Sequence, residues 1–146
     1  MKSDPTQTTL HDFQAVFLAA QAAELGALLV GGHAANFWAG LILPDEPELH
    51  QFLPFTSKDL DLLGSKDDLL TLARSLRAEA KEMRPGAPTP VLGVIQFTTN
   101  AGLATQVEIL FSLRGVDPQE VAESAAHVFS PDLDLTIKVP SPLVCL

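Results

Sequence analysis

The apolar residues of this chain change their spacing several times, and each change predicts a new helix or strand. After Thr8 and Thr9, either of which can cap a helix, apolar side chains recur at the three- and four-residue intervals of one buried helix face: Leu10, Phe13, Val16, Phe17 and Ala20. Residues 27–30 are a short continuous apolar run, which predicts a buried strand. Gly31-Gly32 then predicts a sharp turn, followed by a helix over residues 34–39.

The next part of the chain predicts a second strand and a third helix. Leucines alternate with aspartates over residues 59–63, which is the period of a strand with two different faces. Ser65, followed closely by two aspartates, predicts a helix start, because the hydroxyl caps the first turn and acids suit the positive end of a helix. Apolar positions from Leu69 to Ala80 predict that this helix continues until Arg84-Pro85-Gly86.

The last part of the chain predicts three more strands and one more helix. Strands over residues 91–98 and 106–112 are joined by residues 99–102, which have the composition of a hairpin turn. Asp117 precedes a proline and, three residues on, a glutamate, a combination typical of a helix start. Alternating apolar residues over 133–139 predict a final strand. This order predicts an α/β (α+β) fold in which helices flank a mixed sheet.

Composition narrows the class of protein. The chain has 146 residues, 47% of them hydrophobic and 18% charged, which predicts a single globular domain over residues 1–146. A net charge of −9 with nine Lys and Arg argues against broad electrostatic binding to a nucleic-acid backbone, although bound metal ions could still supply positive charge for a nucleotide. Cys145 is the single cysteine, so the chain forms no internal disulfide and no multi-cysteine zinc site.

The remaining composition signals concern location and loops. Neither a signal peptide nor an apolar run long enough to cross a bilayer is present, so we expect a cytoplasmic protein that does not enter membranes. Three prolines and three acids between Gly40 and Pro54 predict an exposed acidic loop near a functional site.

Two aspartates in the second strand are the first candidate for chemistry. Because side chains alternate along a strand, Asp59 and Asp61 point to one side while Leu60 and Leu62 point to the other. Like charges this close repel unless a cation lies between them, and oxygen ligands suit Mg²⁺ or Mn²⁺. The strand therefore predicts a metal site.

A strand, a Gly-Gly turn that opens a helix, and a later strand with Asp-x-Asp together resemble the DNA polymerase beta-like nucleotidyltransferase superfamily. The matching stretches are Leu28–Asn36 and Thr56–Leu63, and the closer likeness is to the small prokaryotic branch that includes the AbiEii-type toxins of toxin–antitoxin systems. Such proteins place a third carboxylate on a later strand, where Glu108 is the candidate, opposite the core-facing Val107, Ile109 and Phe111. Residues 138–143 are similar to the passage into the family's C-terminal helical part, which we expect to be missing from this chain.

The resemblance implies a nucleotidyltransferase that moves a nucleoside monophosphate from an NTP to an acceptor hydroxyl on RNA or protein. Two divalent metal ions, Mg²⁺ or Mn²⁺, would be held by the catalytic acids Asp59, Asp61 and Glu108. The implied nucleotide-binding residues are Gly31, Gly32, His33, Ser57 and Lys58. By the same resemblance, a cognate antitoxin or toxin is an implied partner.

Each of these candidate metal and nucleotide sites also has a purely structural interpretation. The chain has a second Asp-x-Asp, Asp132 to Asp134, which we interpret as a turn before an edge strand. Glycine turns serve geometry alone in many proteins, and a histidine at a helix start, such as His33, often has a structural role. Gly32 stands where many relatives have serine, and Glu108 where aspartate is usual. These departures favour a second class, a catalytically inactive nucleotidyltransferase-fold module that binds or regulates. A scaffold without any ligand is the third.

Overall fold

A computed structural model of the chain describes residues 7–42, 56–113 and 117–141. Most of the acidic loop predicted between Gly40 and Pro54 lies outside these ranges, as do Cys145 and the residues beyond Ser141. In the described part, no helix is both long enough and apolar enough to span a membrane.

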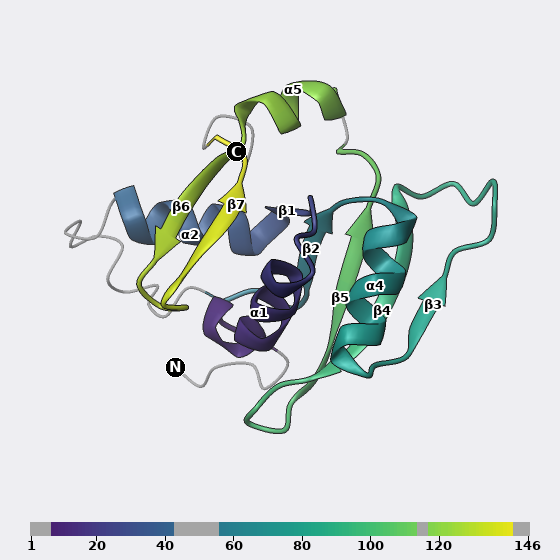
Figure 1. Ribbon diagram of the computed structural model, residues 1–146, viewed down its shortest axis with the longest axis horizontal. Helices are drawn as coiled ribbons and strands as arrows, with labels where there is room; N and C mark the ends of the chain where they lie inside the picture. The colour runs from purple at the N-terminus through teal and green to yellow at the C-terminus, as the bar shows by residue number, and fades with distance from the viewer. Residues whose placement is uncertain (1–6, 43–55, 114–116, 142–146) are drawn as a thin grey trace.

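The described chain contains both helices and strands (Figure 1). The helical elements are η1 (Leu10–Phe13, a 3₁₀ helix), α1 (Gln14–Ala22), α2 (Gly31–Ile42), α4 (Lys66–Leu76) and α5 (Pro118–Ser124). The strands are β1 (Leu28–Val30), β2 (Leu60–Leu63), β3 (Ala80–Glu82), β4 (Val91–Thr98), β5 (Ala104–Leu110), β6 (Ala126–Ser130) and β7 (Leu135–Val139). The predicted α/β architecture is confirmed.

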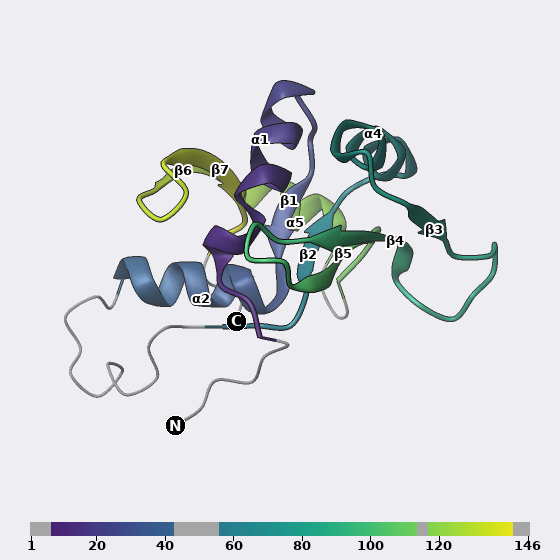
Figure 2. The same cartoon turned by 90° about the horizontal axis from the view of Figure 1, so that it is seen from below.

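Five strands form one mixed sheet in the order β1-β2-β5-β4-β3. Strands β2 and β5 run parallel, and every other neighbouring pair is antiparallel. Strands β6 and β7 form a separate two-stranded ribbon, which packs beside β1 at the opposite end from β3 (Figure 2).

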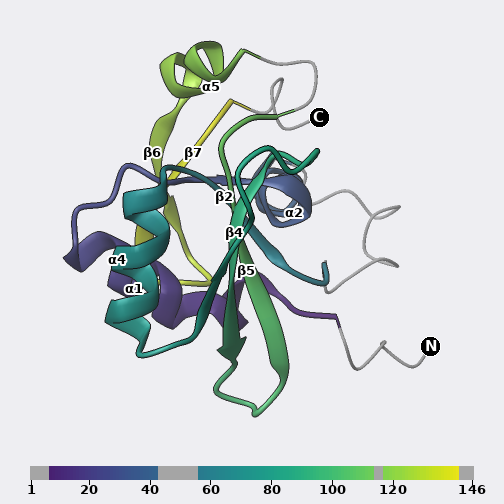
Figure 3. The same cartoon turned by 90° about the vertical axis from the view of Figure 1, so that its right-hand side faces the viewer.

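One face of the sheet carries the main core. Leu60 and Leu62 of β2 are buried there with Val107 and Ile109 of β5, as their alternation predicts. Helices α1 and α4 cover this face, while α2 leaves β1 on the other side of the strands (Figure 3). Asp61, between the two leucines, therefore points away from the main core.

The opposite face of the sheet carries a second, smaller core at one end. A smaller apolar cluster forms there around Val121 of α5: Leu28, Val30, Leu63, Leu110 and Val121. Toward the β4–β5 hairpin, the same face carries polar side chains such as Gln96 and Gln106. The carboxylates of β2 and β5 lie between this cluster and the hairpin.

The helix expected to reach Arg84 ends at Leu76, so this prediction was wrong. Arg77 adopts a left-handed conformation, with φ 53°, and its N–H bonds to the carbonyls that close α4. Ala80, expected on the buried helix face, instead begins strand β3 and pairs with Ile95 of β4. The open edge of β4 thus overrides the helical spacing of this segment.

Other boundaries also moved. Helix α2 begins at Gly31, earlier than expected, and β6 was not predicted. Strand β5 covers Ala104–Leu110 in place of residues 106–112. Phe111, expected in the core, is 52% exposed, because the strand ends at Leu110 and its alternation of faces does not continue to Phe111.

Candidate carboxylate and glycine-turn site

Two parallel strands bring the candidate acids together. Asp61 of β2 lies directly beside Glu108 of β5 in the register, and Val30 of β1 lies on its other side. Asp59, two residues before Asp61, precedes the strand. All three carboxylates are half-buried. The predicted position of Glu108, on the face opposite Val107 and Ile109, is confirmed.

The pKa of Asp61 is strongly raised by its surroundings. Burial, together with a side-chain hydrogen bond to Glu108 and the charges of Glu108 and Asp59, raises the pKa of Asp61 to about 7. Its Oδ1 atom is buried and has no hydrogen-bond partner among the described residues. A bond between two carboxyl groups needs a proton on one of them. With its pKa raised to about 7, Asp61 is partly protonated near neutral pH and can donate this bond to Glu108.

The pKa of Asp59 is shifted in the same direction as that of Asp61. Burial and the neighbouring charge of Glu108 raise the pKa of Asp59, while the ammonium group of Lys58 opposes the shift. A divalent cation beside these groups would relieve the repulsion and satisfy the unpartnered oxygen of Asp61. Carboxylate oxygens are the donor type that Mg²⁺ and Mn²⁺ prefer. Within residues 7–42, 56–113 and 117–141, however, no three acidic, histidine or cysteine side chains are grouped to hold a metal by themselves.

Gly31 lies against the Asp61 carboxylate. Its φ of +72° is a conformation that side-chain-bearing residues rarely adopt. A Cβ atom at this position would overlap Asp61 Oδ2 and would lie 3.1 Å from both Asp61 Cβ and Cγ. Glycine is thus required twice here, by the backbone and by the neighbouring acid.

Gly32 lies against Ser57 in a similar way. A Cβ atom on Gly32 would lie 2.5 Å from Ser57 Oγ and 3.2 Å from Ser57 Cβ. The Ser57 hydroxyl therefore occupies the space in which a side chain at position 32 would begin. The turn, Ser57 and the carboxylates form one continuous site.

His33 is placed inside the protein. It is 1% exposed, its ring lies edge-on to Phe13, and its Nε2 atom is 3.0 Å from the hydroxyl of Thr8. Burial lowers the pKa of His33 to about 4, with the charge of Asp12 opposing the shift, so the ring is neutral at physiological pH. This environment favours the structural interpretation of His33 over phosphate contact. Thr8 was missed as a site residue, because only the tertiary structure brings it to His33.

Lys58 opens onto a polar cleft beside Asp59. The cleft has a volume of about 350 Å³ and is lined by Lys58, Asp59, Gln96, Ala104, Thr105 and Gln106. Gln106 faces Gln96 across the β4–β5 ladder, two residues from Glu108. The two glutamines therefore extend the carboxylate face with groups that both donate and accept hydrogen bonds.

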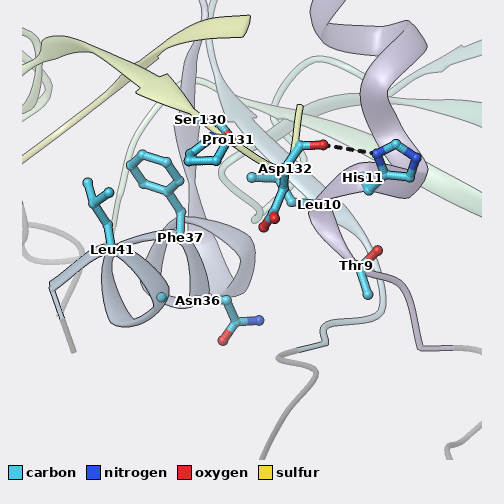
Figure 4. Close-up of a pocket in the computed structure, with 10 residues that line it drawn as sticks. Thr9, Leu10, His11, Asn36, Phe37, Leu41, Ser130, Pro131 and Asp132 are labelled. Atoms are coloured by element: carbon cyan, nitrogen blue, oxygen red, sulfur yellow. Dashed lines mark hydrogen bonds between the residues drawn. The ribbon is translucent and has the colours of Figure 1, made fainter. Parts of the chain in front are cut away.

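A larger cavity lies elsewhere and contains none of the predicted site residues. Its volume is about 880 Å³, and Phe37 and Leu41 of α2 project into it toward Ser130 and Pro131 (Figure 4). The His11 ring is 3.0 Å from the backbone oxygen of Asp132 at its rim. Asp132, of the second Asp-x-Asp, thus lies in a turn on this side, as expected.

The described chain has a nucleotidyltransferase-like fold, in which helices flank a mixed five-stranded sheet. A crystal structure of an antigenic nucleotidyltransferase-like protein from Paracoccidioides brasiliensis has this fold, with a TM-score of 0.54 and 16% sequence identity. The match covers 95% of the present chain and 65% of the P. brasiliensis chain. No protein-family model and no curated protein sequence matches the chain.

Proposed function

We propose that this chain is a metal-dependent nucleotidyltransferase that moves a nucleoside monophosphate from an NTP to an acceptor hydroxyl. The observation that carries the proposal is the contact between Gly31 and Asp61. It holds the N-terminus of α2, where free backbone N–H groups favour phosphate, against a carboxylate that has an unpartnered buried oxygen. Such an acid next to a phosphate-binding turn is unfavourable unless a cation joins the two.

In this proposal the acids bind the metal and the glycines contact the triphosphate. Asp59, Asp61 and Glu108 would hold Mg²⁺ or Mn²⁺, and phosphate oxygens and water would complete the coordination. The bound metal would supply positive charge to the triphosphate and the acceptor oxygen. Gly31 and Gly32 allow the triphosphate to approach the backbone closely.

Ser57 and Lys58 flank the proposed phosphate position. Ser57 presents a hydroxyl at Gly32, and Lys58 is exposed beside Asp59, where it adds a cation to a largely acidic surface. The polar cleft with Gln96 and Gln106 is open to an acceptor that carries neutral hydroxyl or amide groups.

Calorimetric titration with the four common NTPs, with and without Mg²⁺ or Mn²⁺, tests this proposal. We expect binding that depends on the metal and is lost in Asp61→Asn, because the neutral amide cannot replace a carboxylate ligand. Asp134→Asn is the matched control, since it changes the second acid of the other Asp-Leu-Asp and lies exposed in a turn. Unchanged binding in Asp61→Asn would overturn the proposal.

A second candidate function is a catalytically inactive binding or regulatory module, as in a toxin–antitoxin pair. The feature that favours it is the raised pKa of Asp61, because a protonated Asp61 that donates to Glu108 reduces the repulsion between the two acids without a metal. Incubation with α-phosphate-labelled NTP, Mg²⁺ and candidate RNA or protein acceptors separates the two. Nucleotide binding without label transfer or NTP consumption would favour the regulatory module.

A further inference from the structure

The segment before η1 contains a buried threonine, Thr8, that contacts Ser57 of the candidate site. Thr8 is 0% exposed, and its backbone forms an isolated antiparallel bridge with Ser57, with N–H to oxygen distances of 2.7 and 2.9 Å. The Thr8 hydroxyl also donates to the carbonyl of Ser57 at 2.7 Å. Thr8 therefore holds Ser57 through three hydrogen bonds, two of them from the backbone.

The single hydroxyl proton of Thr8 determines which ring nitrogen of His33 carries a proton. A hydroxyl has one proton, and that of Thr8 is donated to the Ser57 carbonyl. The 3.0 Å contact between Thr8 Oγ1 and His33 Nε2 must then be donated by the ring. His33 is consequently the tautomer with its proton on Nε2, and the chain of donors runs from His33 through Thr8 to Ser57.

This chain of bonds connects the two halves of the site. His33 follows Gly31-Gly32 directly in α2, whereas Ser57 and Lys58 lead into Asp59. Thr105 of β5 holds the same segment from the other side, by donating to the Lys58 carbonyl at 2.9 Å. The place where Ser57 Oγ faces Gly32 is thus bracketed by buried threonine hydroxyls.

We propose that Thr8 is a positioning residue, which together with His33 sets the distance between the glycine turn and the segment that carries Ser57 and Asp59. The inference rests on the proposed function, because that distance matters only if the two halves bind one triphosphate. Thr8 touches no ligand itself. Its role is to keep the Ser57 hydroxyl and the Asp59 carboxylate in place before the nucleotide arrives.

The test compares variants of the full chain that differ by one hydroxyl. Thr8→Val removes the hydroxyl and keeps the shape, and Thr8→Ser retains the hydroxyl. Thr99→Val removes the hydroxyl of another buried threonine, in the β4–β5 hairpin. Magnesium with each of the four common NTPs is the probe, measured by calorimetry. We expect affinity to fall about tenfold in Thr8→Val and to stay near wild type in Thr8→Ser and Thr99→Val.

A second pair of variants, at His33, tests the same inference even if Thr8→Val fails to fold. His33→Gln keeps an N–H donor at the ε position, whereas His33→Leu removes it, and we expect only His33→Leu to weaken nucleotide binding. Amide hydrogen exchange reports the positioning directly, and should accelerate at Ser57 in Thr8→Val and His33→Leu.

The outcomes separate this inference from the proposed function. Absence of metal-dependent binding in the wild type overturns the proposed function and, with it, this inference. Wild-type binding that persists unchanged in folded Thr8→Val and His33→Leu overturns the positioning role alone. Weaker binding in these two, with recovery in Thr8→Ser and His33→Gln, establishes it.

Discussion

Asp61 shows how a single residue depends on neighbours that lie far away in the sequence. Its carboxylate is bounded by Gly31 at the start of α2 and by Glu108 on the adjacent parallel strand. Each neighbour restricts it differently, since the glycine turn leaves room for the acid, whereas Glu108 repels its charged form and accepts a hydrogen bond from its protonated form. A substitution of either neighbour should therefore change the position or the pKa of the Asp61 carboxyl group.

Substitution of Gly31 by alanine should destabilise the fold more than its backbone conformation alone explains. Gly102 is a matched control, because its φ of +85° is similar and a Cβ there meets nothing within 4 Å. We expect Gly102→Ala to cost about 1–2 kcal/mol of unfolding free energy. Gly31→Ala should cost at least about 1 kcal/mol more, because its Cβ overlaps Asp61. Urea unfolding measures both, and equal losses would contradict the contact.

At the scale of elements, α4 has a well-defined start and an unfavourable end. Ser65 and Asp68 form a reciprocal capping box at its N-terminus. At its C-terminus, Arg77 occupies the left-handed position that usually belongs to glycine. The helix therefore stops at the cost of backbone strain, and this stop allows Ala80–Glu82 to pair with β4.

Arg77→Gly should accordingly stabilise the protein. Glycine relieves the left-handed strain but loses more freedom on folding, so we expect a net gain of about 0.5–1 kcal/mol. Arg74→Gly makes the same chemical change inside the last turn of α4, where glycine should cost about 1 kcal/mol. Chemical denaturation of the two variants decides the matter. A loss of stability in both would show that the strain at Arg77 is not significant.

At the scale of the whole molecule, two buried groups give opposite pH dependences. Burial and acidic neighbours raise the pKa of Asp61 from 3.8 to about 7, so its contribution to stability is present at low pH and is lost as pH rises through this range. Burial lowers the pKa of His33 from 6.5 to about 4, so its contribution is present above pH 6.5 and is lost as pH falls. The two trends partly cancel in the wild type.

Variants should reveal the two trends separately. The unfolding free energy of Asp61→Asn, taken relative to wild type, should increase between pH 4 and about 7 and then level off. The corresponding difference for His33→Gln should decrease between pH 4 and 6.5, because the wild type regains stability as its histidine loses the proton. Thermal or urea unfolding across this range measures both. Differences that do not vary with pH would contradict the assigned environments.

Local signals in the sequence were sufficient for most elements and for the position of the carboxylates. Alternation placed Leu60 and Leu62 in the core and Asp61 on the other face, because a strand has a period of two whatever its partners. The same argument placed Glu108 opposite Val107 and Ile109. The roles assigned to these acids in metal and nucleotide binding stay predictions.

What the sequence by itself determined is therefore local: most of the helices and strands, most of their buried faces, and the glycine turn at the start of α2. The tertiary structure alone decided which distant residues meet. It placed Thr8 against His33 and Ser57, ended α4 at Arg77 so that β3 pairs with β4, and set Asp61 beside both Gly31 and Glu108. Periodicity reflects the geometry of one segment, whereas these contacts depend on strand register and on packing between segments, which no local pattern encodes.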